Sequence, residues 1–199
     1  MIYEVRTYTL RPGTVAEFEE RYAKRLPLRE KHSNLGAFWH TEFGPLNQVV
    51  HVYPYDDLRH RTAVRAALAQ DTARAQLPGG QDLIAAQEAE IMNPAPFMRT
   101  LGSRDYGTGN VYEMRTYTYA PGDIPKVLEA WAKAIEAREK FSPLAACWTS
   151  ELGGSTSSST PGCTRISTSA PGSVRNPAAP AVRGRHRLEC GRSGRKTSC

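Results

Sequence analysis

The segment IYEVRTYTLRPG, residues 2–13, returns 109 residues later as VYEMRTYTYAPG, residues 111–122. Eight of the twelve positions are identical, which chance does not produce. The same register continues through the triplet Arg-Glu-Lys at 29–31 and 138–140. An internal repeat sets the architecture of a whole chain. The sequence therefore predicts two copies of one structural unit.

The secondary structure of the first copy follows from its hydrophobic pattern. Residues 2–9 alternate with a period of two, as a strand does. Pro12–Gly13 then turns the chain, and Thr14 and Glu17 have the spacing of a capping box at the start of a helix that runs to about Lys31. The next elements are predicted as strands at 35–43 and 47–55, a helix capped by Asp56 or Asp57, and a segment at 83–92 that suits either a helix or an edge strand.

The element order β-α-β-β-α-β is typical of the ferredoxin-like unit, a four-stranded antiparallel sheet with helices on one face. We therefore expect an α+β protein with two ferredoxin-like modules in tandem, whose sheets face each other as in a dimeric α+β barrel. Trp39 and Trp148 recur in the repeat, and we expect them between sheet and helix. The predicted divisions are a complete module at 1–96, a linker at 97–109, a partial second module at 110–154 and a disordered tail at 155–199.

The repeat stops at Gly154, where Leu46–His51 of the first copy is replaced by Ser155–Thr160. Codons exist for these six residues that, read one base earlier, encode Leu-Asn-Gln-Phe-Val-His. Our hypothesis is that the chain from about residue 155 is translated out of frame; a natural Ser/Pro/Arg-rich disordered tail is the alternative. A truncated second module would leave a strand edge and an apolar sheet face uncovered. We therefore expect poor solubility, or pairing with a second copy of the chain as a homodimer.

The positive charge of the chain does not indicate a nucleic-acid-binding protein. The net charge of +6 arises from residue 155 onward, where eight Lys or Arg accompany one acid, so residues 1–154 are close to neutral. The four cysteines match no metal-site spacing and no disulfide framework. No run is long and apolar enough for a membrane span, and no targeting segment is recognisable. We expect a cytoplasmic protein without a metal.

The linked motifs resemble those of the NIPSNAP family. They are Tyr3-Glu4-x-Arg6-x-Tyr8, Pro12-Gly13, Trp39-x-x-Glu42-x-Gly44 and Leu46-Asn47-Gln48-x-x-His51-x-Tyr53. The resemblance covers the first copy and the second up to Gly153, although Tyr53 stands where the family usually has Trp. It implies tandem ferredoxin-like modules around a shared interior, a bacterial type of member, and no defined reaction. A module that binds a partner or a small ligand is therefore the expected function.

Two neighbouring strands carry the candidate ligand-binding residues. Strand alternation places Glu4, Arg6 and Tyr8 on one face, and Asn47, His51 and Tyr53 on one face of the strand at 47–55. If both faces look into the barrel, they form a polar pocket. A buried Glu–Arg pair either orients an acidic or carbonyl ligand or fixes the strand register. Its recurrence as Glu113 and Arg115, with Tyr117, favours the structural role.

His51 has the widest chemical range among these residues. Neutral imidazole offers an acid, a base or a haem ligand, but a lone histidine in a strand is more often a hydrogen-bonded core residue. The alternative function is a small monooxygenase-like enzyme that uses Arg6, His51 and Tyr8 in a polar barrel interior, an idea that depends on fold analogy alone. No motif in the sequence requires a cofactor, so none is predicted, and haem stays an unsupported alternative for such an enzyme.

Overall fold

The computed structural model of the protein describes residues 1–103, 111–152, 162–168 and 185–190. The helices are α1 (Val15–Glu30), α2 (Leu58–Gln70), α3 (Thr72–Ala75) and α4 (Ile124–Glu139), with a short 3₁₀ helix at Gln81–Leu83. The strands are β1 (Ile2–Leu10), β2 (Ala37–Phe43), β3 (Gln48–Tyr55), β4 (Ile84–Pro94), β5 (Val111–Thr118), β6 (Leu144–Leu152), β7 (Gly162–Thr168) and β8 (Arg185–Cys190).

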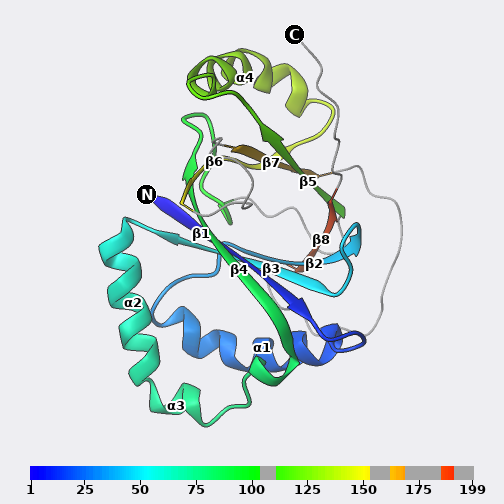
Figure 1. The fold of residues 1–199 in the computed structure, drawn as a ribbon. Coiled ribbons are helices and arrows are strands. Elements are labelled where there is room, and N and C mark those ends of the chain that lie inside the picture. Colours follow the sequence, from blue (N-terminus) through cyan, green and yellow to red (C-terminus); the bar gives the residue numbers. More distant parts are fainter. Residues whose placement is uncertain (104–110, 153–161, 169–184, 191–199) are drawn as a thin grey trace.

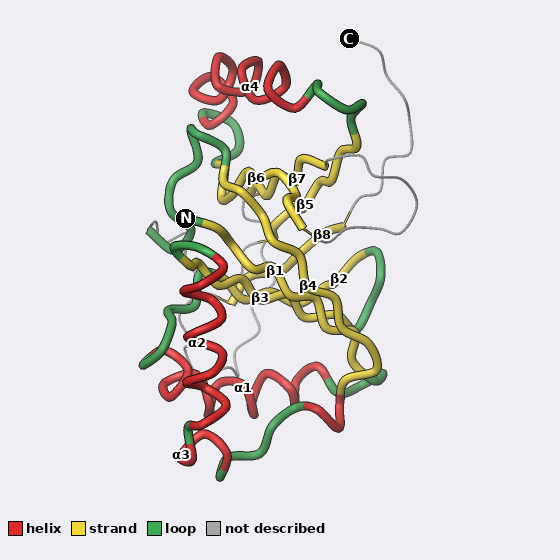
Figure 2. Tube along the Cα trace, turned by 60° about the vertical axis from the view of Figure 1, so that its left-hand side comes forward, coloured by secondary structure: helices red, strands yellow, loops and turns green. Residues whose placement is uncertain are grey.

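The eight strands close into a barrel in the order β1-β3-β2-β8-β5-β7-β6-β4. Helices α1, α2 and α3 cover the outside of the barrel on one side, and α4 lies on the opposite side (Figures 1 and 2). Strands β4, β1, β3 and β2 are neighbours in that order and pair antiparallel. This is the ferredoxin-like arrangement expected for the first copy, and the ambiguous segment at 83–92 belongs to the strand β4.

Strands β7 and β8 correct the prediction for the end of the chain. The sequence predicts a truncated second module and a disordered tail at 155–199, but β7 pairs antiparallel with β5 and β6, and β8 pairs parallel with β2 and β5. An unpaired strand edge exposes backbone N–H and C=O groups, and these two strands supply the partners. The other residues from 155 onward lie outside the described residues, as do 104–110 of the predicted linker.

The described side chains of the barrel interior are apolar and tightly packed. They come from six strands and include Tyr3 and Val5 of β1, Trp39 of β2, Val50 of β3 and Trp148 of β6. Trp39 and Trp148 are 1% and 0% exposed within this cluster. The prediction that they pack between sheet and helix is wrong, because their strand positions have the interior-facing parity.

Two predicted helix starts have different outcomes. The backbone N–H of His60 donates to the Asp57 carboxylate over 2.8 Å, so Asp57 caps α2. Thr14 precedes α1, but its hydroxyl donates to the Arg11 carbonyl over 2.7 Å and makes no cap bond. The predicted capping box is therefore absent, and the turn at Gly13, whose φ is +81°, sets the entry to α1.

Candidate functional site

A pocket of about 490 Å³ lies between the outer face of the sheet and the helices of the first half. Its volume is within the range of small-molecule sites. Its lining residues in the described part of the chain all fall between Glu4 and Gln87. The residues that the argument uses are Glu4, Arg6, Tyr8, Arg21, Tyr22, Arg25, Arg29, His51, Tyr53, Arg65, Arg74, Gly79 and Gly80.

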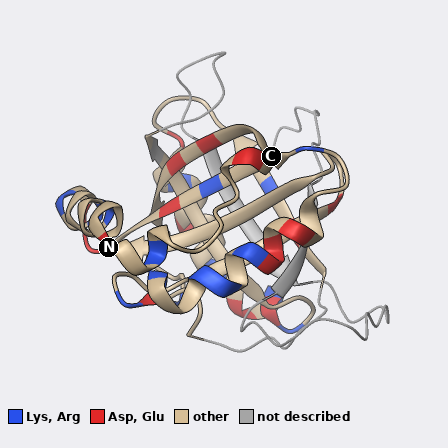
Figure 3. Cartoon of the chain, turned by 90° about the horizontal axis from the view of Figure 1, so that it is seen from below, with Lys and Arg blue, Asp and Glu red and all other residues tan. Residues whose placement is uncertain are grey.

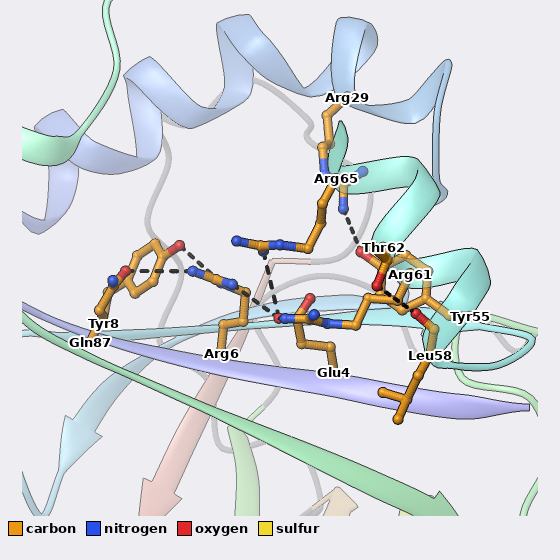
Figure 4. Close-up of polar contacts among 10 residues, drawn as sticks. All are labelled: Glu4, Arg6, Tyr8, Arg29, Tyr55, Leu58, Arg61, Thr62, Arg65 and Gln87. Atoms are coloured by element: carbon orange, nitrogen blue, oxygen red, sulfur yellow. Dashed lines mark hydrogen bonds and ion pairs between the residues drawn. The ribbon is translucent and has the colours of Figure 1, made fainter. Parts of the chain in front are cut away.

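The polar pocket is therefore outside the barrel and not in its interior, which corrects the sequence prediction. On β1, Tyr3 and Val5 point into the barrel, so the alternating Glu4, Arg6 and Tyr8 point toward the helices. Figure 4 shows Glu4 and Arg6 rising from β1 toward α1 and α2. The barrel interior is occupied by apolar side chains. Their burial does not require any charged group to be removed from water, which would be unfavourable.

Glu4 is the centre of a buried ion-pair network at one end of the pocket. Its carboxylate is 1% exposed and accepts from Arg6 over 3.0 Å and from Arg61 over 2.5 Å, with Arg65 at 3.7 Å (Figure 4). Arg6 in turn donates through Nε to the Tyr8 hydroxyl over 3.0 Å. A carboxylate with several cationic partners is tolerated in a buried site, where an unpaired charge is not.

The network keeps its members charged. Burial alone would raise the pKa of Glu4, but the hydrogen bond from Arg61 and the charges of Arg6, Arg61 and Arg65 lower it below its usual value. Burial would lower the pKa of Arg6, but Tyr8 and Glu4 raise it above its usual value. Glu4 is thus an anion held by cations, and it is not available as a proton donor at neutral pH.

The helix side of the pocket is rich in arginine. Six arginines line the pocket against one carboxylate, Glu4. Viewed from the side of α1–α3, Lys and Arg lie along the helices that cover the sheet (Figure 3). Arg21 is paired with Glu17 and with Asp82, and Arg6 and Arg65 share Glu4. The remaining three, Arg25, Arg29 and Arg74, form no ion pair among the described residues.

Two of these arginines, Arg25 and Arg29, have unused hydrogen-bonding capacity. Arg25 donates to the Arg74 carbonyl over 3.2 Å, but its buried Nε has no partner in the described part of the chain. Arg29 donates to the Tyr55 hydroxyl over 2.8 Å and lies 4.0 Å from the centre of the Tyr53 ring, and its buried Nη1 has no partner there either. Burial and the nearby charge of Arg74 lower the pKa of Arg25. An anion in the pocket would relieve this repulsion.

An aromatic cluster from the sheet and α1 surrounds His51. The His51 ring is in edge contact with the rings of Tyr8, Tyr22, Phe38 and Tyr53, at centroid distances of 4.7 to 6.3 Å. The hydroxyls of Tyr22 and Tyr53 share a short hydrogen bond. Burial raises the pKa of both tyrosines, so both stay protonated. The aromatic rings around His51 suit a flat, apolar group of a ligand.

His51 is a neutral imidazole without a hydrogen-bond partner. It is 5% exposed, and neither Nδ1 nor Nε2 has a partner among the described residues. Burial, followed by the charges of Arg6 and Arg29, lowers its pKa to about 3. An unsatisfied buried polar group costs about 1–3 kcal/mol, so the site contains a group that a ligand can stabilise. The hydrogen-bonded core residue predicted as the more common role of such a histidine is not observed.

Two glycines bring the chain close to the helix wall of the pocket. A Cβ built on Gly79 would lie 2.8 Å from Nη1 of Arg25, and a Cβ on Gly80 would lie 2.5 Å from the Phe18 ring. The Phe18 ring leaves no room for a side chain at Gly80, whereas the atoms nearest Gly79 are the ends of the Gln81 and Arg25 side chains, which can move aside. Glycine at position 80 thus lets the chain close this side of the pocket against Phe18.

The structure brings together five of the six predicted ligand-binding candidates. Glu4, Arg6, Tyr8, His51 and Tyr53 all line the pocket. The sixth, Asn47, precedes β3 with φ of 58°, and its carbonyl accepts from the Leu10 N–H over 2.7 Å. Asn47 is therefore a turn residue that does not line the pocket.

The repeat counterparts lie on β5, in the other half of the barrel. Glu113 and Arg115 form an ion pair of 2.7 Å, as predicted from the repeat. Glu113 and Tyr117, through a hydrogen bond and charge, raise the pKa of Arg115. Glu113 is 29% and Arg115 44% exposed, in contrast to the buried pair of the first copy.

The arginines of α1 were missed by sequence reasoning, although a signal was present. Arg21, Arg25 and Arg29 recur every four residues and so share one helix face, next to Tyr22 and Leu26. The repeat sharpens this signal, because the positions of Arg21 and Arg25 are occupied by Ala130 and Ala134 in the second copy. Helix positions that are basic in one copy and apolar in the other distinguish the two copies.

Two further searches of the described residues gave negative results. No group of three or more His, Cys, Asp or Glu side chains there is arranged to hold a metal ion. None of the helices in the described ranges combines the length and the apolar character that crossing a membrane requires.

Known proteins resemble this chain in sequence and in fold. A family model described as NIPSNAP matches residues 3–99 and 112–159. Protein NipSnap homolog 3A from Homo sapiens is 36% identical over 140 residues, which are 69% of this chain and 56% of that protein, so the chain spans little more than half of this relative. Protein NipSnap homolog 3B from Mus musculus is 35% identical over 157 residues, 76% of this chain and 62% of that protein.

Solved structures add to the comparison. An uncharacterized NIPSNAP domain protein from Burkholderia xenovorans is 33% identical, with a TM-score of 0.46 over 49% of this chain and 97% of that chain. A proposed monooxygenase from Lactobacillus acidophilus covers 84% of this chain and 76% of its own with a TM-score of 0.56, but at 12% identity it shows a shared fold alone. From the family match and the curated relatives, the chain belongs to the NIPSNAP family.

Proposed function

We propose that this chain binds a small organic anion, a carboxylate or a phosphate ester, in the pocket between β1, β3 and the helices α1 and α2. The observation that carries the proposal is the set of three pocket arginines, Arg25, Arg29 and Arg74, that form no ion pair among the described residues. Guanidinium groups recognise carboxylates and phosphates through paired N–H donors. The pocket volume of about 490 Å³ supports a ligand of small-molecule size.

Glu4 has a structural role in this proposal. It is the shared counter-ion of Arg6, Arg61 and Arg65, whereas Arg25 and Arg74 line the pocket without an ion pair among the described residues. The alternative of a monooxygenase-like enzyme depended on a polar barrel interior. The described interior is apolar, and the structural relative that suggests such chemistry supports the fold alone.

Isothermal titration calorimetry with benzoate and phenyl phosphate, at constant ionic strength and pH 7, tests the proposal. We expect both anions to bind the wild-type chain and Arg25→Gln to weaken binding about tenfold, because a charge-assisted hydrogen bond is lost. Arg138→Gln is the matched control, since Arg138 lies on α4, away from the pocket, and its variant should bind like the wild type. No binding by the wild type, or equal binding by the Arg25 variant, would contradict the proposal.

We also propose that the second half is a copy of the first module whose later part is read out of frame. The repeat ends at Gly154, and the family match ends at residue 159. The nucleotide sequence around codon 154 tests it: codons incompatible with the one-base shift would exclude it. Self-association and a cytoplasmic location stay predictions, to be tested by sedimentation and by cell fractionation.

A further inference from the structure

The proposed anion pocket is lined by two chemically different groups of residues, and this inference rests on that proposed function. The first is the arginine pair Arg25 and Arg74, which form no ion pair among the described residues. The second is the aromatic cluster in which the rings of Tyr8, Tyr22 and Tyr53 surround His51. A ligand that contacts both groups presents an anionic group to the arginine pair and a flat group to the aromatic cluster.

His51 adds a polar requirement to the aromatic cluster. Its two ring nitrogens are shielded from solvent, and neither has a hydrogen-bond partner among the described residues. All four rings around it touch it edge-on, which leaves its polar atoms unsatisfied. A buried polar group without a partner makes a site selective, because a ligand that hydrogen-bonds it gains binding free energy and a ligand without a polar group does not.

We infer that the ligand is a hydroxylated aromatic acid or aryl phosphate, whose anionic group binds the arginine pair and whose ring hydroxyl hydrogen-bonds His51. A hydroxyl donates and accepts, so it can pair with either ring nitrogen in either tautomer of the neutral ring. An ammonium group at this place is disfavoured by the positive charges of Arg6 and Arg29, the same charges that act on His51.

The tyrosines beside His51 form the gate to this contact. The hydroxyls of Tyr22 and Tyr53 share one hydrogen bond, and both rings are in contact with His51. A ligand reaches the imidazole when one of these side chains turns aside, and its hydroxyl then takes the place of the displaced contact. This rearrangement costs part of the binding free energy gained from the new hydrogen bond, so the preference for a hydroxylated ligand should be moderate.

Calorimetry with two matched ligand pairs at pH 7 tests the inference. The pairs are 4-hydroxybenzoate with benzoate and 4-hydroxyphenyl phosphate with phenyl phosphate, so the carboxylate and phosphate classes are measured separately. We expect the hydroxylated member of at least one pair to bind about five- to tenfold more tightly to the wild type, as expected for one added hydrogen bond. His51→Phe should bind both members of that pair equally, whereas Arg25→Gln should weaken both and preserve their ratio.

The outcomes separate this inference from the proposed function. Equal affinities within both pairs in the wild type, or a hydroxyl preference that persists in His51→Phe, would overturn the inference while anion binding stands. Failure of all four ligands to bind would overturn both. Should His51→Phe not fold, as judged by circular dichroism, ¹⁵N NMR of the wild-type imidazole decides: the hydroxylated ligand must shift the His51 nitrogen resonances and its unhydroxylated partner must not.

Discussion

The two copies of the Glu-x-Arg-x-Tyr pattern, on β1 and on β5, form the same ion pair in different surroundings. The Glu4–Arg6 distance is 3.0 Å and the Glu113–Arg115 distance is 2.7 Å. Glu4, however, is 1% exposed and Glu113 29%. The strand sequence is thus sufficient for the ion pair, but the pocket depends on the elements that cover the strand.

The covering elements differ in two ways. Helix α1 carries Arg21 and Arg25 where α4 carries Ala130 and Ala134, so only the first helix supplies cations at these positions. Along the sheet, the strand partner of Arg6 is His51, whereas the strand partner of Arg115 is Arg165. The first half therefore combines an arginine-rich wall with a buried imidazole, and the described part of the second half does not repeat this combination.

Removal of the charge at the two glutamates should produce the largest difference between the copies. Glu4→Gln leaves Arg6, Arg61 and Arg65 without their shared anion, and we expect it to lower the free energy of unfolding by about 3 kcal/mol. Glu113→Gln breaks a partly exposed pair and should cost less than about 1 kcal/mol. Urea denaturation of both variants measures the effect. Equal losses would show that burial of the first pair carries no extra energy.

The second-largest expected effect is a loss of stability at acidic pH, which arises from His51 in the first half of the chain. The pKa of His51 is about 3 in the fold and about 6.5 in the unfolded chain, so below pH 6.5 the unfolded state binds the extra proton and stability falls. Between pH 6.5 and 5 this loss is about 2 kcal/mol. The hydrogen bond to Glu19 raises the pKa of His40, so its contribution is already complete below pH 6.5 and does not offset the loss. Denaturant unfolding at several pH values measures it.

His51→Phe is the corresponding control, since it removes the titrating group and keeps the ring. The variant should lose the pH dependence between 6.5 and 5. If wild type and variant show the same slope over this range, His51 is not the group responsible, and the difference between the halves would have to be sought in other residues.

The smallest expected loss of stability is for substitution of the turn glycines Gly13 and Gly122, and it should be equal in the two copies. Gly13 and Gly122 have φ of 81° and 88°, and no atom lies within 4 Å of a Cβ built at either position. Gly13→Ala and Gly122→Ala should therefore each cost about 1 kcal/mol through backbone strain alone. Thermal unfolding of the two variants measures it. A much larger loss at one turn would show that the turns are not equivalent.

The fold of the first half was predictable because its signals are local. The alternation of residues 2–9, the turn at Pro12–Gly13 and the cap at Asp57 each indicate an element without reference to the rest of the chain. Strands β7 and β8 were not predicted, since they lie in a Ser/Pro/Arg-rich region whose composition is typical of disorder, and the edges that they pair with belong to β2, β5 and β6. Pairing to an available edge is a tertiary effect that overrides local preference.

The candidate site was predicted in composition but not in position. Strand parity correctly groups Glu4 with Arg6 and His51 with Tyr53, but parity does not say which face is inside the barrel. The size of the side chains on the other face gives that answer, because Tyr3, Val5 and Trp39 form the packed interior. The arginines of α1 were not predicted as site residues, because a charged helix face is ordinarily solvent-exposed. This face lines a pocket only because the polar side chains of β1 and β3 lie opposite it.

In the described part of the chain, the residues that line the pocket fall between Glu4 and Gln87, and none of them comes from across the barrel. A pocket built within one half of the barrel can change its ligand without disturbing the apolar interior that both halves share. Variants that lose binding through Arg25 or Arg74, which form no ion pair among the described residues, should therefore keep the closed barrel.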